Sequence, residues 1–230
     1  MHLPLFPGFL SGNQLKILAL LAMTCDHAGL LLLPQYPILR GIGRLAFPIF
    51  AWFIAEGCRY TKNRGRYFFM IAVLALFCQA VSFLYAGSLY QTILVTFSIS
   101  ILWIFAVDRA QRLGTWGAWW IAGSVGGVSF FLSEILPLWV RGSGFAIDYG
   151  FWGIFFPLAV WLAEGYWSRL AAAALVLAVL SLSDGVLIQW FSLFALFPLA
   201  LYNGQRGTWN LKYLFYIYYP LHLVVLHLLK

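Results

Sequence analysis

Asp26 and His27 lie side by side in the middle of an apolar stretch, LKILALLAMTCDHAGLLLL, which covers residues 15–33. Burying a charge inside a membrane helix costs about 2.5–3.5 kcal/mol even on the most lenient scale, so both residues are candidates for function. Lys16 precedes His27 by eleven positions. At about 100° per residue, an α-helix presents these two side chains on one face, about 16 Å apart along its axis. Asp26 points about 100° away from His27, which favours another partner for its carboxylate.

His27 is the member of this group best suited to chemistry at neutral pH. A neutral imidazole can take a proton from an attacking amine or hydroxyl, and an unperturbed pKa of about 6.5 suits that role. An imidazole can also carry an acyl group as a covalent intermediate. A third interpretation stays open, in which His27 is a core residue that bonds a backbone carbonyl or a hydroxyl.

Further polar residues are expected at a similar depth, in the outer half of the membrane. Arg44 is the favoured partner of Asp26, since the pair would neutralise both charges. His222, in the segment YYPLH, could line a cavity together with these residues or could be an interfacial packing residue. This polar layer comprises Asp26, His27, Arg40, Arg44, Asp148, Tyr149 and His222.

A second polar set lies at the other end of the next apolar stretch. Glu56, Arg59 and Tyr60 have the i, i+3, i+4 spacing that places side chains on one helix face. The segment RYTKNRGR follows, over residues 59–66. A short loop with several cations suits a polyphosphate ligand, because Arg and Lys pair with phosphate oxygens. The same loop could instead be an orientation signal, since basic residues are common in cytoplasmic loops. The cations are Arg59, Lys62, Arg64 and Arg66.

The composition places these residues in a membrane protein. Of the 230 residues, 63% are hydrophobic and 9% are charged, whereas soluble domains carry about 25% charged residues. A chain of this length has too little interior to hide so much apolar surface from water. The net charge of +7 is explained by basic cytoplasmic loops and anionic lipid, so we expect no nucleic-acid partner. Metal-binding and nucleotide-binding motifs are absent from the sequence, so we expect no metal cofactor.

The apolar stretches predict an all-α, polytopic bundle of about nine transmembrane helices, with eight to ten as the range. Each stretch is long enough to cross a hydrocarbon layer of about 30 Å. Nine spans would place ten of the 14 basic residues on one side, which predicts a cytoplasmic N-terminus. No linker marks a second domain, so residues 1–230 are expected to form one. The predicted spans are 15–34, 42–60, 67–86, 90–107, 116–133, 147–164, 169–184, 187–202 and 211–229.

Four segments of the chain resemble the TraX family, and the resemblance runs from about Leu15 to Leu226. The segments are LKILALLAMTCDHAG (15–29), LRGIGRLAFPIFAWFIAEGCRYT (39–61), IDYGFWGI (147–154) and NLKYLFYIYYPLHLVVL (210–226). The TraX family is associated with acetylation of conjugative pilin at its N-terminus. TraX-like proteins in turn resemble the larger group of membrane acyltransferases, acyltransferase family 3, which acetylate carbohydrates. In that group the first span carries a basic residue, ten others and then a histidine, and Lys16 and His27 match this spacing.

The resemblance implies that His27 is catalytic, that acetyl-CoA enters from the cytoplasm and that the acceptor enters from the other side. In such an acyl transfer, either Arg44 or Tyr149 could stabilise the oxyanion, and Asp148 could orient the acceptor amine or His27. The sequence therefore predicts an acetyltransferase of the bacterial inner membrane, with acetyl-CoA as acyl donor and a pilin-like peptide or a carbohydrate as acceptor. Two alternatives stay open: a small proton-coupled transporter and a noncatalytic membrane chaperone. The catalytic set is His27, Asp26, Arg44, Asp148 and Tyr149; the CoA-binding set is Lys16, Glu56, Arg59, Lys62, Arg64 and Arg66; the substrate-binding set is Arg40 and His222.

Overall fold

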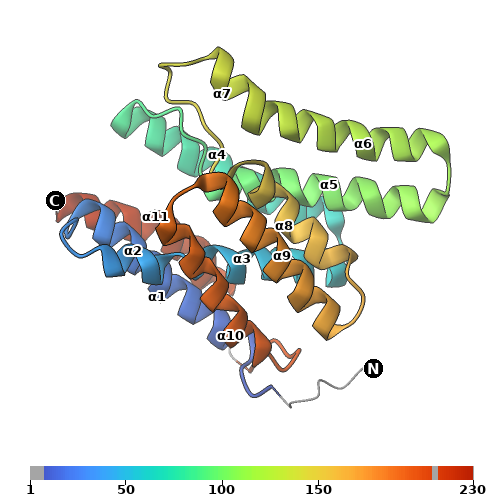
Figure 1. Cartoon of the computed structure of the whole chain (residues 1–230), viewed down its shortest axis with the longest axis horizontal. Helices are drawn as coiled ribbons and strands as arrows, with labels where there is room; N and C mark the ends of the chain where they lie inside the picture. The colour runs from blue at the N-terminus through green and yellow to red at the C-terminus, as the bar shows by residue number, and fades with distance from the viewer. Residues whose placement is uncertain (1–7, 209–211, 230) are drawn as a thin grey trace. The chain divides into compact units, whose positions relative to one another are not determined.

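The computed structural model describes residues 8–208 and 212–229, and within these ranges its regular elements are all helices, with no strand longer than an isolated bridge (Figure 1). The predicted all-α class is confirmed. Residue 211, the first of the last predicted span, lies outside the described residues. The helices are α1 (Gly12–Leu31), α2 (Pro37–Gly43), α3 (Ala46–Tyr60), α4 (Arg64–Ala86), α5 (Ile93–Leu113), α6 (Trp116–Phe130), the π-helix η1 (Phe131–Ile135), α7 (Leu136–Trp139), α8 (Gly150–Leu162), α9 (Tyr166–Asp184), the 3₁₀-helix η2 (Leu187–Ala195), α10 (Leu196–Ala200) and α11 (Lys212–Leu228).

Six helical segments of the described chain are long and apolar enough to cross a membrane, so the protein is a multi-pass membrane protein. Of the prediction of about nine spans, the multi-pass character and these six candidate spans are confirmed, and the number nine is not. Three further apolar helices are shorter, and a helix of 13 residues, such as α8, rises only about 20 Å. The six segments are Gly12–Leu31, Pro37–Tyr60, Arg64–Leu84, Ile93–Leu113, Trp116–Trp139 and Tyr166–Asp184, and the shorter ones are Gly150–Leu162, Leu187–Ala200 and Ile217–Leu226.

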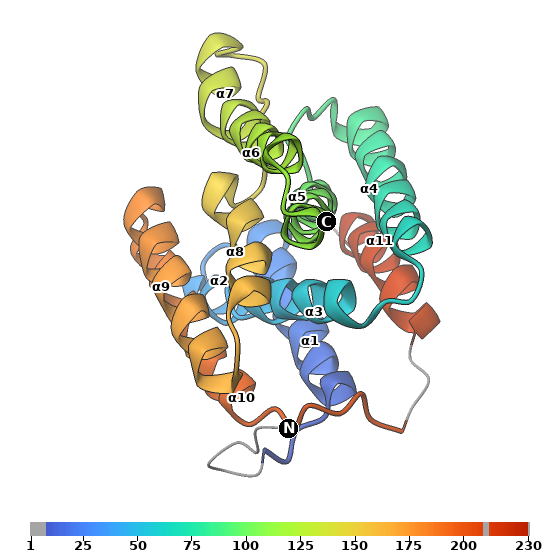
Figure 2. The same ribbon diagram turned by 90° about the vertical axis from the view of Figure 1, so that its right-hand side faces the viewer.

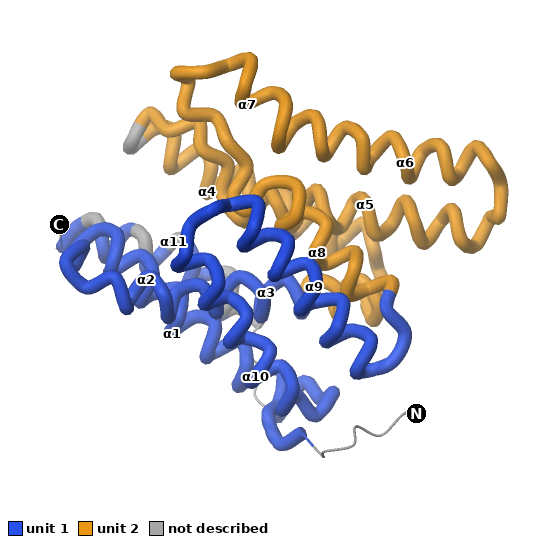
Figure 3. The backbone as a smooth tube through the Cα atoms, viewed as in Figure 1, with its two compact units in different colours: residues 1–53, 163–230 blue, residues 54–162 orange. Residues whose placement is uncertain are grey.

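The chain divides into two compact units (Figure 3). Unit 1 comprises residues 1–53 and 163–230, and unit 2 comprises residues 54–162. The single domain expected from the sequence stays a prediction.

In unit 1, α1 packs against both α2 and α11. A capping box begins α1, because the Ser11 hydroxyl accepts from the Gln14 amide while the Gln14 side chain accepts from the Ser11 amide. The predicted span 42–60 is wrong at its start: the helix begins at Pro37, and a turn at residues 44–45 separates α2 from α3. Pro is favoured in the first turn of a helix because it has no amide hydrogen to leave unbonded. The core beside α1 contains Leu20, Ala22, Met23 and Ala46, with Leu45, Phe50, Tyr218 and Tyr219 packed against it.

In unit 2, α5 is the central helix, and α4, α6 and α8 pack around it (Figure 2). The Ser100 hydroxyl of α5 lies within hydrogen-bonding distance of its own helix carbonyl at Thr96 and of the Ile154 carbonyl of α8. The buried hydroxyl of Ser100 thus finds polar partners in the protein and lies between the two helices, where a membrane interior offers no water to bond it.

Candidate functional site

His27 of α1 and His222 of α11 form a contacting pair in unit 1. Their rings meet edge to face, with centroids 4.9 Å apart and planes inclined at 72°. His222 Nε2 lies 3.4 Å from His27 Nδ1. His222 is buried, with 6% of its surface exposed. Two residues that sequence reasoning placed in different roles, one catalytic and one substrate-binding, therefore lie in direct contact.

The hydrogen bonds around this pair assign its protons. His27 Nδ1 lies 2.9 Å from the Met23 carbonyl oxygen, and His222 Nδ1 lies 2.9 Å from the Tyr218 carbonyl oxygen. A carbonyl oxygen only accepts, so in the neutral rings both Nδ1 atoms carry hydrogen. His222 Nε2 then has a lone pair and is the second, longer acceptor of the His27 Nδ1–H, which it shares with the Met23 carbonyl. The lone pair of His27 consequently lies on Nε2, which is its basic nitrogen.

Two tyrosines of α11 pack on His222, and one of them also bonds α1. The Tyr218 ring stacks on His222 at 5.5 Å and 11°, and the Tyr219 ring meets it edge-on at 5.6 Å. Thr24 Oγ1 donates to the Leu20 carbonyl at 2.9 Å, so the Tyr218 hydroxyl, 2.6 Å from Thr24 Oγ1, is the donor to it. Sequence reasoning missed Thr24 and Tyr218, although each lies three or four residues before a histidine and therefore on its helix face.

Asp26 pairs with Arg40 rather than with Arg44 as predicted. Arg40 Nη1 donates to Asp26 Oδ2 at 2.7 Å, and both side chains are largely buried. Gly43 explains the geometry, because a Cβ at this position would lie 2.3 Å from the Asp26 Cβ. Helix α2 therefore crosses α1 at Gly43, and Arg40, three residues earlier, faces the carboxylate. Arg44 lies beyond the end of α2, in the turn. Arg40 was predicted to bind substrate, and here it neutralises Asp26.

The Asp26–Arg40 pair should couple the two residues energetically. Asp26→Asn leaves a mostly buried guanidinium without its anion, and we expect it to lower the free energy of unfolding by about 1–3 kcal/mol. Adding Arg40→Gln should restore at least about 1 kcal/mol of this loss. Arg40→Lys is the matched control and should retain most of the stability, since only one N–H bonds the carboxylate. Unfolding in mixed detergent is measured for five proteins: the parent, Asp26→Asn, Arg40→Gln, the double variant and Arg40→Lys. Strictly additive losses would contradict the pairing.

Lys16, predicted to bind CoA, lies with its Nζ 4.7 Å from the centre of the Phe53 ring in unit 1. This cation–π contact stabilises the Lys16 ammonium near the N-terminus of α1. The common face that the spacing predicts for Lys16 and His27, and a role of Lys16 toward CoA, stay predictions.

The predicted CoA-binding loop belongs to unit 2. Its Arg64 forms an ion pair with Asp108, which also binds Arg112 at 2.8 Å, and the guanidinium of Arg64 lies over Phe105 at 5.2 Å. Arg59 Nη2 donates to the Trp161 carbonyl at 2.6 Å. Lys62 and Arg66 are exposed, whereas Glu56 is buried. The loop thus divides into cations with protein partners and cations at the surface. Sequence reasoning missed Asp108.

Asp148 and Tyr149 lie at the start of α8, also in unit 2. The Tyr90 hydroxyl donates to Asp148 Oδ1 at 2.6 Å, and Thr96 Oγ1 donates to the Asp148 carbonyl at 2.8 Å. Tyr149 has φ +61°, a left-handed conformation that non-glycine residues rarely adopt. Glu134 Oε1 accepts from the Phe151 amide at 2.8 Å and so caps the helix. Glu134 was missed by sequence reasoning. The predicted contribution of Asp148 and Tyr149 to chemistry at His27 stays a prediction.

Comparison with known proteins identifies the family. The family model described as TraX protein matches residues 11–230, which is nearly the whole chain. The chain belongs to the TraX family. It is 25% identical over 248 residues to the probable fimbrial assembly protein FimC, serogroup H1, of Dichelobacter nodosus, an alignment that covers 94% of each chain. It is also 34% identical over 93 residues to the uncharacterized protein RP591 of Rickettsia prowazekii (strain Madrid E), covering 40% of this chain and 36% of that protein. No solved structure matches.

The TraX match includes every residue of the histidine site, from Thr24 on α1 to His222 on α11. The resemblance to this family is confirmed, whereas the wider link to acyltransferase family 3 stays a prediction. The site of this TraX family member offers one basic imidazole nitrogen, held by a second imidazole and by a carbonyl. Such an arrangement can accept a proton from an amine or a hydroxyl.

Proposed function

We propose that this TraX family protein is an integral membrane acetyltransferase, which moves an acetyl group from acetyl-CoA to an acceptor amine. The observation that carries the proposal is the His27–His222 contact, which assigns the basic lone pair of His27 to Nε2. The favoured acceptor is the N-terminus of a pilin-like protein. Its support is the association of the family with pilin acetylation and the name of the Dichelobacter relative, a probable fimbrial assembly protein.

In the proposed reaction, the acceptor nitrogen attacks the thioester carbonyl of acetyl-CoA. A carbon–nitrogen bond forms, and the carbon–sulfur bond breaks. His27 Nε2 takes the proton that the amine loses and returns it to the departing thiolate, so the products are the N-acetylated acceptor and the CoA thiol. An acetyl-histidine intermediate is the alternative route to the same products. A carbohydrate hydroxyl could replace the amine without changing the role of His27.

The proposed location is the bacterial inner membrane, with the N-terminus in the cytoplasm. This orientation places most basic residues on the cytoplasmic side. The loop of residues 59–66 would then face the compartment from which acetyl-CoA binds. The exposed cations Lys62 and Arg66 are the candidates to pair with its phosphates. Arg64 supports the loop through Asp108 instead.

The loop cations should therefore separate into two classes when substituted. Arg66→Gln should raise the KM for acetyl-CoA about five- to tenfold, with an unchanged free energy of unfolding, because an exposed phosphate partner is lost. Arg64→Gln should lower that free energy by about 0.5–1 kcal/mol, because Asp108 loses one of two cations. Steady-state kinetics and detergent unfolding measure the two effects. An unchanged KM in Arg66→Gln would make the loop an orientation signal.

The function itself is tested with the purified protein in detergent, acetyl-CoA and a synthetic peptide that carries the N-terminus of a pilin-like protein. We expect release of free thiol together with a peptide mass gain of one acetyl group. Unacetylated CoA in place of acetyl-CoA is the control and should give no mass gain. Thiol release without peptide modification would redirect the search to carbohydrate hydroxyls. Neither release nor binding of acetyl-CoA would reject the enzyme and favour the transporter or the chaperone.

A further inference from the structure

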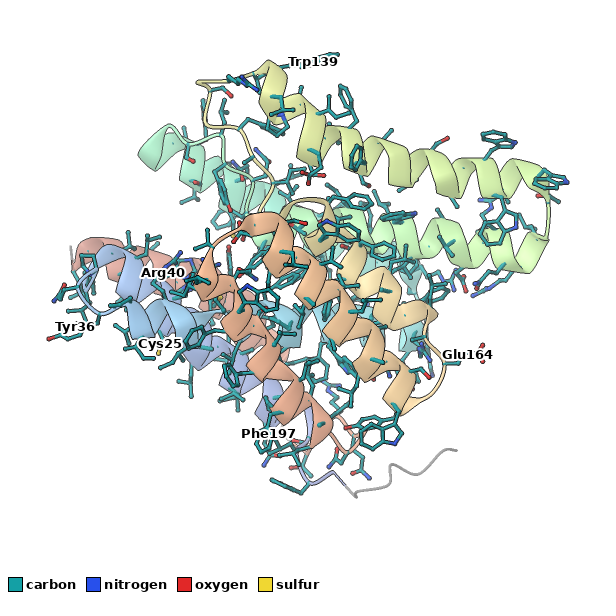
Figure 4. The ribbon with its side chains drawn as sticks, in the orientation of Figure 1. Cys25, Tyr36, Arg40, Trp139, Glu164 and Phe197 are labelled. Atoms are coloured by element: carbon teal, nitrogen blue, oxygen red, sulfur yellow. The ribbon has the colours of Figure 1, made fainter. Side chains whose placement is uncertain are left out.

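Helix η2 has its polar and apolar faces arranged for a membrane protein with a polar interior. Its buried face consists of Gln189, Ser192 and Ala195, which are 2%, 0% and 0% exposed. The opposite face carries Leu187 and Phe194, which are 84% and 63% exposed, and Phe197 of α10 continues this surface (Figure 4). Polar residues of membrane helices that face inward mark binding sites and pathways. The buried face of η2 is therefore a candidate site.

The backbone of η2 aligns its two polar side chains. A 3₁₀-helix has three residues per turn, so Gln189 and Ser192 lie one above the other, about 6 Å apart. A 3₁₀ run of nine residues is unusual, since such runs seldom exceed three or four residues and often mark functional segments. Gln189 and Ser192 thus present an amide and a hydroxyl on one line, in unit 1.

Each of these two side chains has a buried polar atom that bonds nothing within the described part of the chain. Gln189 Nε2 and Ser192 Oγ are buried atoms with no hydrogen-bond partner there. Leaving such a group unbonded costs about 1–3 kcal/mol. Serines elsewhere avoid this cost by donating to the carbonyl four residues earlier: Ser98, Ser100, Ser124, Ser129, Ser133, Ser181 and Ser183 all do so. Ser192 Oγ, by contrast, makes no such bond to the backbone of η2.

Helix η2 is connected through packing to the helix that carries His27. Phe191 of η2 packs closely on α2, because a Cβ added to Gly41 would lie only 3.0 Å from the Phe191 ring. Helix α2 in turn crosses α1 at Gly43 and binds Asp26, the residue before His27, through Arg40. The polar face of η2 and the histidine pair therefore belong to one packed set of helices in unit 1.

We propose that Gln189 and Ser192 bind a secondary amide group of a substrate. Gln189 Nε2 donates to the amide carbonyl, and Ser192 Oγ accepts from the amide N–H. The ligand group is uncharged, because both side chains are neutral and a buried charge needs a charged partner. This proposal rests on the proposed acetyl transfer, in which both substrates carry such amides: the pantetheine arm of acetyl-CoA and the backbone of a peptide acceptor.

The test measures binding of two uncharged probes, S-acetylpantetheine and N-acetyl-trialanine amide, by thermal-shift titration of the full chain in detergent. The variants are Gln189→Leu and Ser192→Ala, and Ser181→Ala is the matched control, a buried serine of the same unit that bonds its own helix. We expect the dissociation constant of one probe to rise at least tenfold in both variants and to stay unchanged in the control. Because both variants remove unbonded buried groups, their melting temperatures without probe should be equal to or above that of the parent.

Each outcome distinguishes the alternatives. Loss of S-acetylpantetheine binding assigns the site to the donor arm, and loss of peptide binding assigns it to the acceptor. Parent-like affinities in both variants, or no binding of either probe to the parent, would overturn the proposal. Since thermal shift needs no turnover, a protein that binds a probe through Ser192 but releases no thiol from acetyl-CoA would reject the enzyme and keep the amide site.

Discussion

The substitution His27→Ala should lower kcat for acetyl transfer by about 10²–10⁴-fold, the range by which a general base accelerates a reaction. The imidazole supplies the basic nitrogen, and its Nδ1–H holds that nitrogen in place through Met23 and His222. Alanine removes the base and leaves a small space on α1, so the fold should persist. Thiol release and acceptor acetylation should fall together, with little change in the KM for acetyl-CoA.

A matched control separates chemistry from helix packing. Cys25 lies two residues earlier on α1 and is likewise partly buried, so Cys25→Ala makes a comparable change on another helix face. It should retain parental kcat. If His27→Ala retained activity as well, the chemistry would belong to another residue. If both variants lost activity equally, α1 packing and not the imidazole would be responsible.

Hydropathy predicts the helical segments well, because it depends only on which residues a segment contains and not on how the helices pack. Six of the predicted spans coincide with helices long enough to cross a membrane. The ends were less accurate: α5 continues to Leu113, beyond the predicted end at residue 107, and Gly114 then adopts the left-handed conformation that ends many helices. This extension brings Asp108 and Arg112 onto one helix turn. Gly114 was the signal that would have placed the end correctly.

The partner of Asp26 depended on a break that hydropathy does not show. Reading residues 42–60 as one helix put Arg44 near Asp26, whereas the break after α2 leaves Arg40 on the facing turn. Pro37 and Gly43 carry that information, because one favours a helix start and the other permits close helix contact. The contact of His27 with His222 had no such local signal, since it depends on how α11 is rotated against α1.

The second large effect is expected at His222, which we place as a positioning residue. His222→Phe preserves the aromatic contacts with Tyr218 but removes the Nε2 acceptor for His27 Nδ1–H. We expect kcat to fall about tenfold, the equivalent of one hydrogen bond of about 1.4 kcal/mol in the transition state. His222→Gln offers a carbonyl oxygen as acceptor and should recover part of this loss. Leu221→Ala, at an exposed neighbour on α11, should have no effect.

The division of the His222 effect between kcat and KM identifies its role. A residue that only positions His27 changes the stabilisation of the transition state, so kcat falls while the KM values for donor and acceptor stay constant. A residue that binds substrate, as the sequence predicted for His222, raises a KM instead. Partial rescue by Gln with a constant KM would support positioning through His27. Equal losses of kcat in His222→Phe and His222→Gln, together with a raised KM for the acceptor, would indicate that His222 binds the substrate.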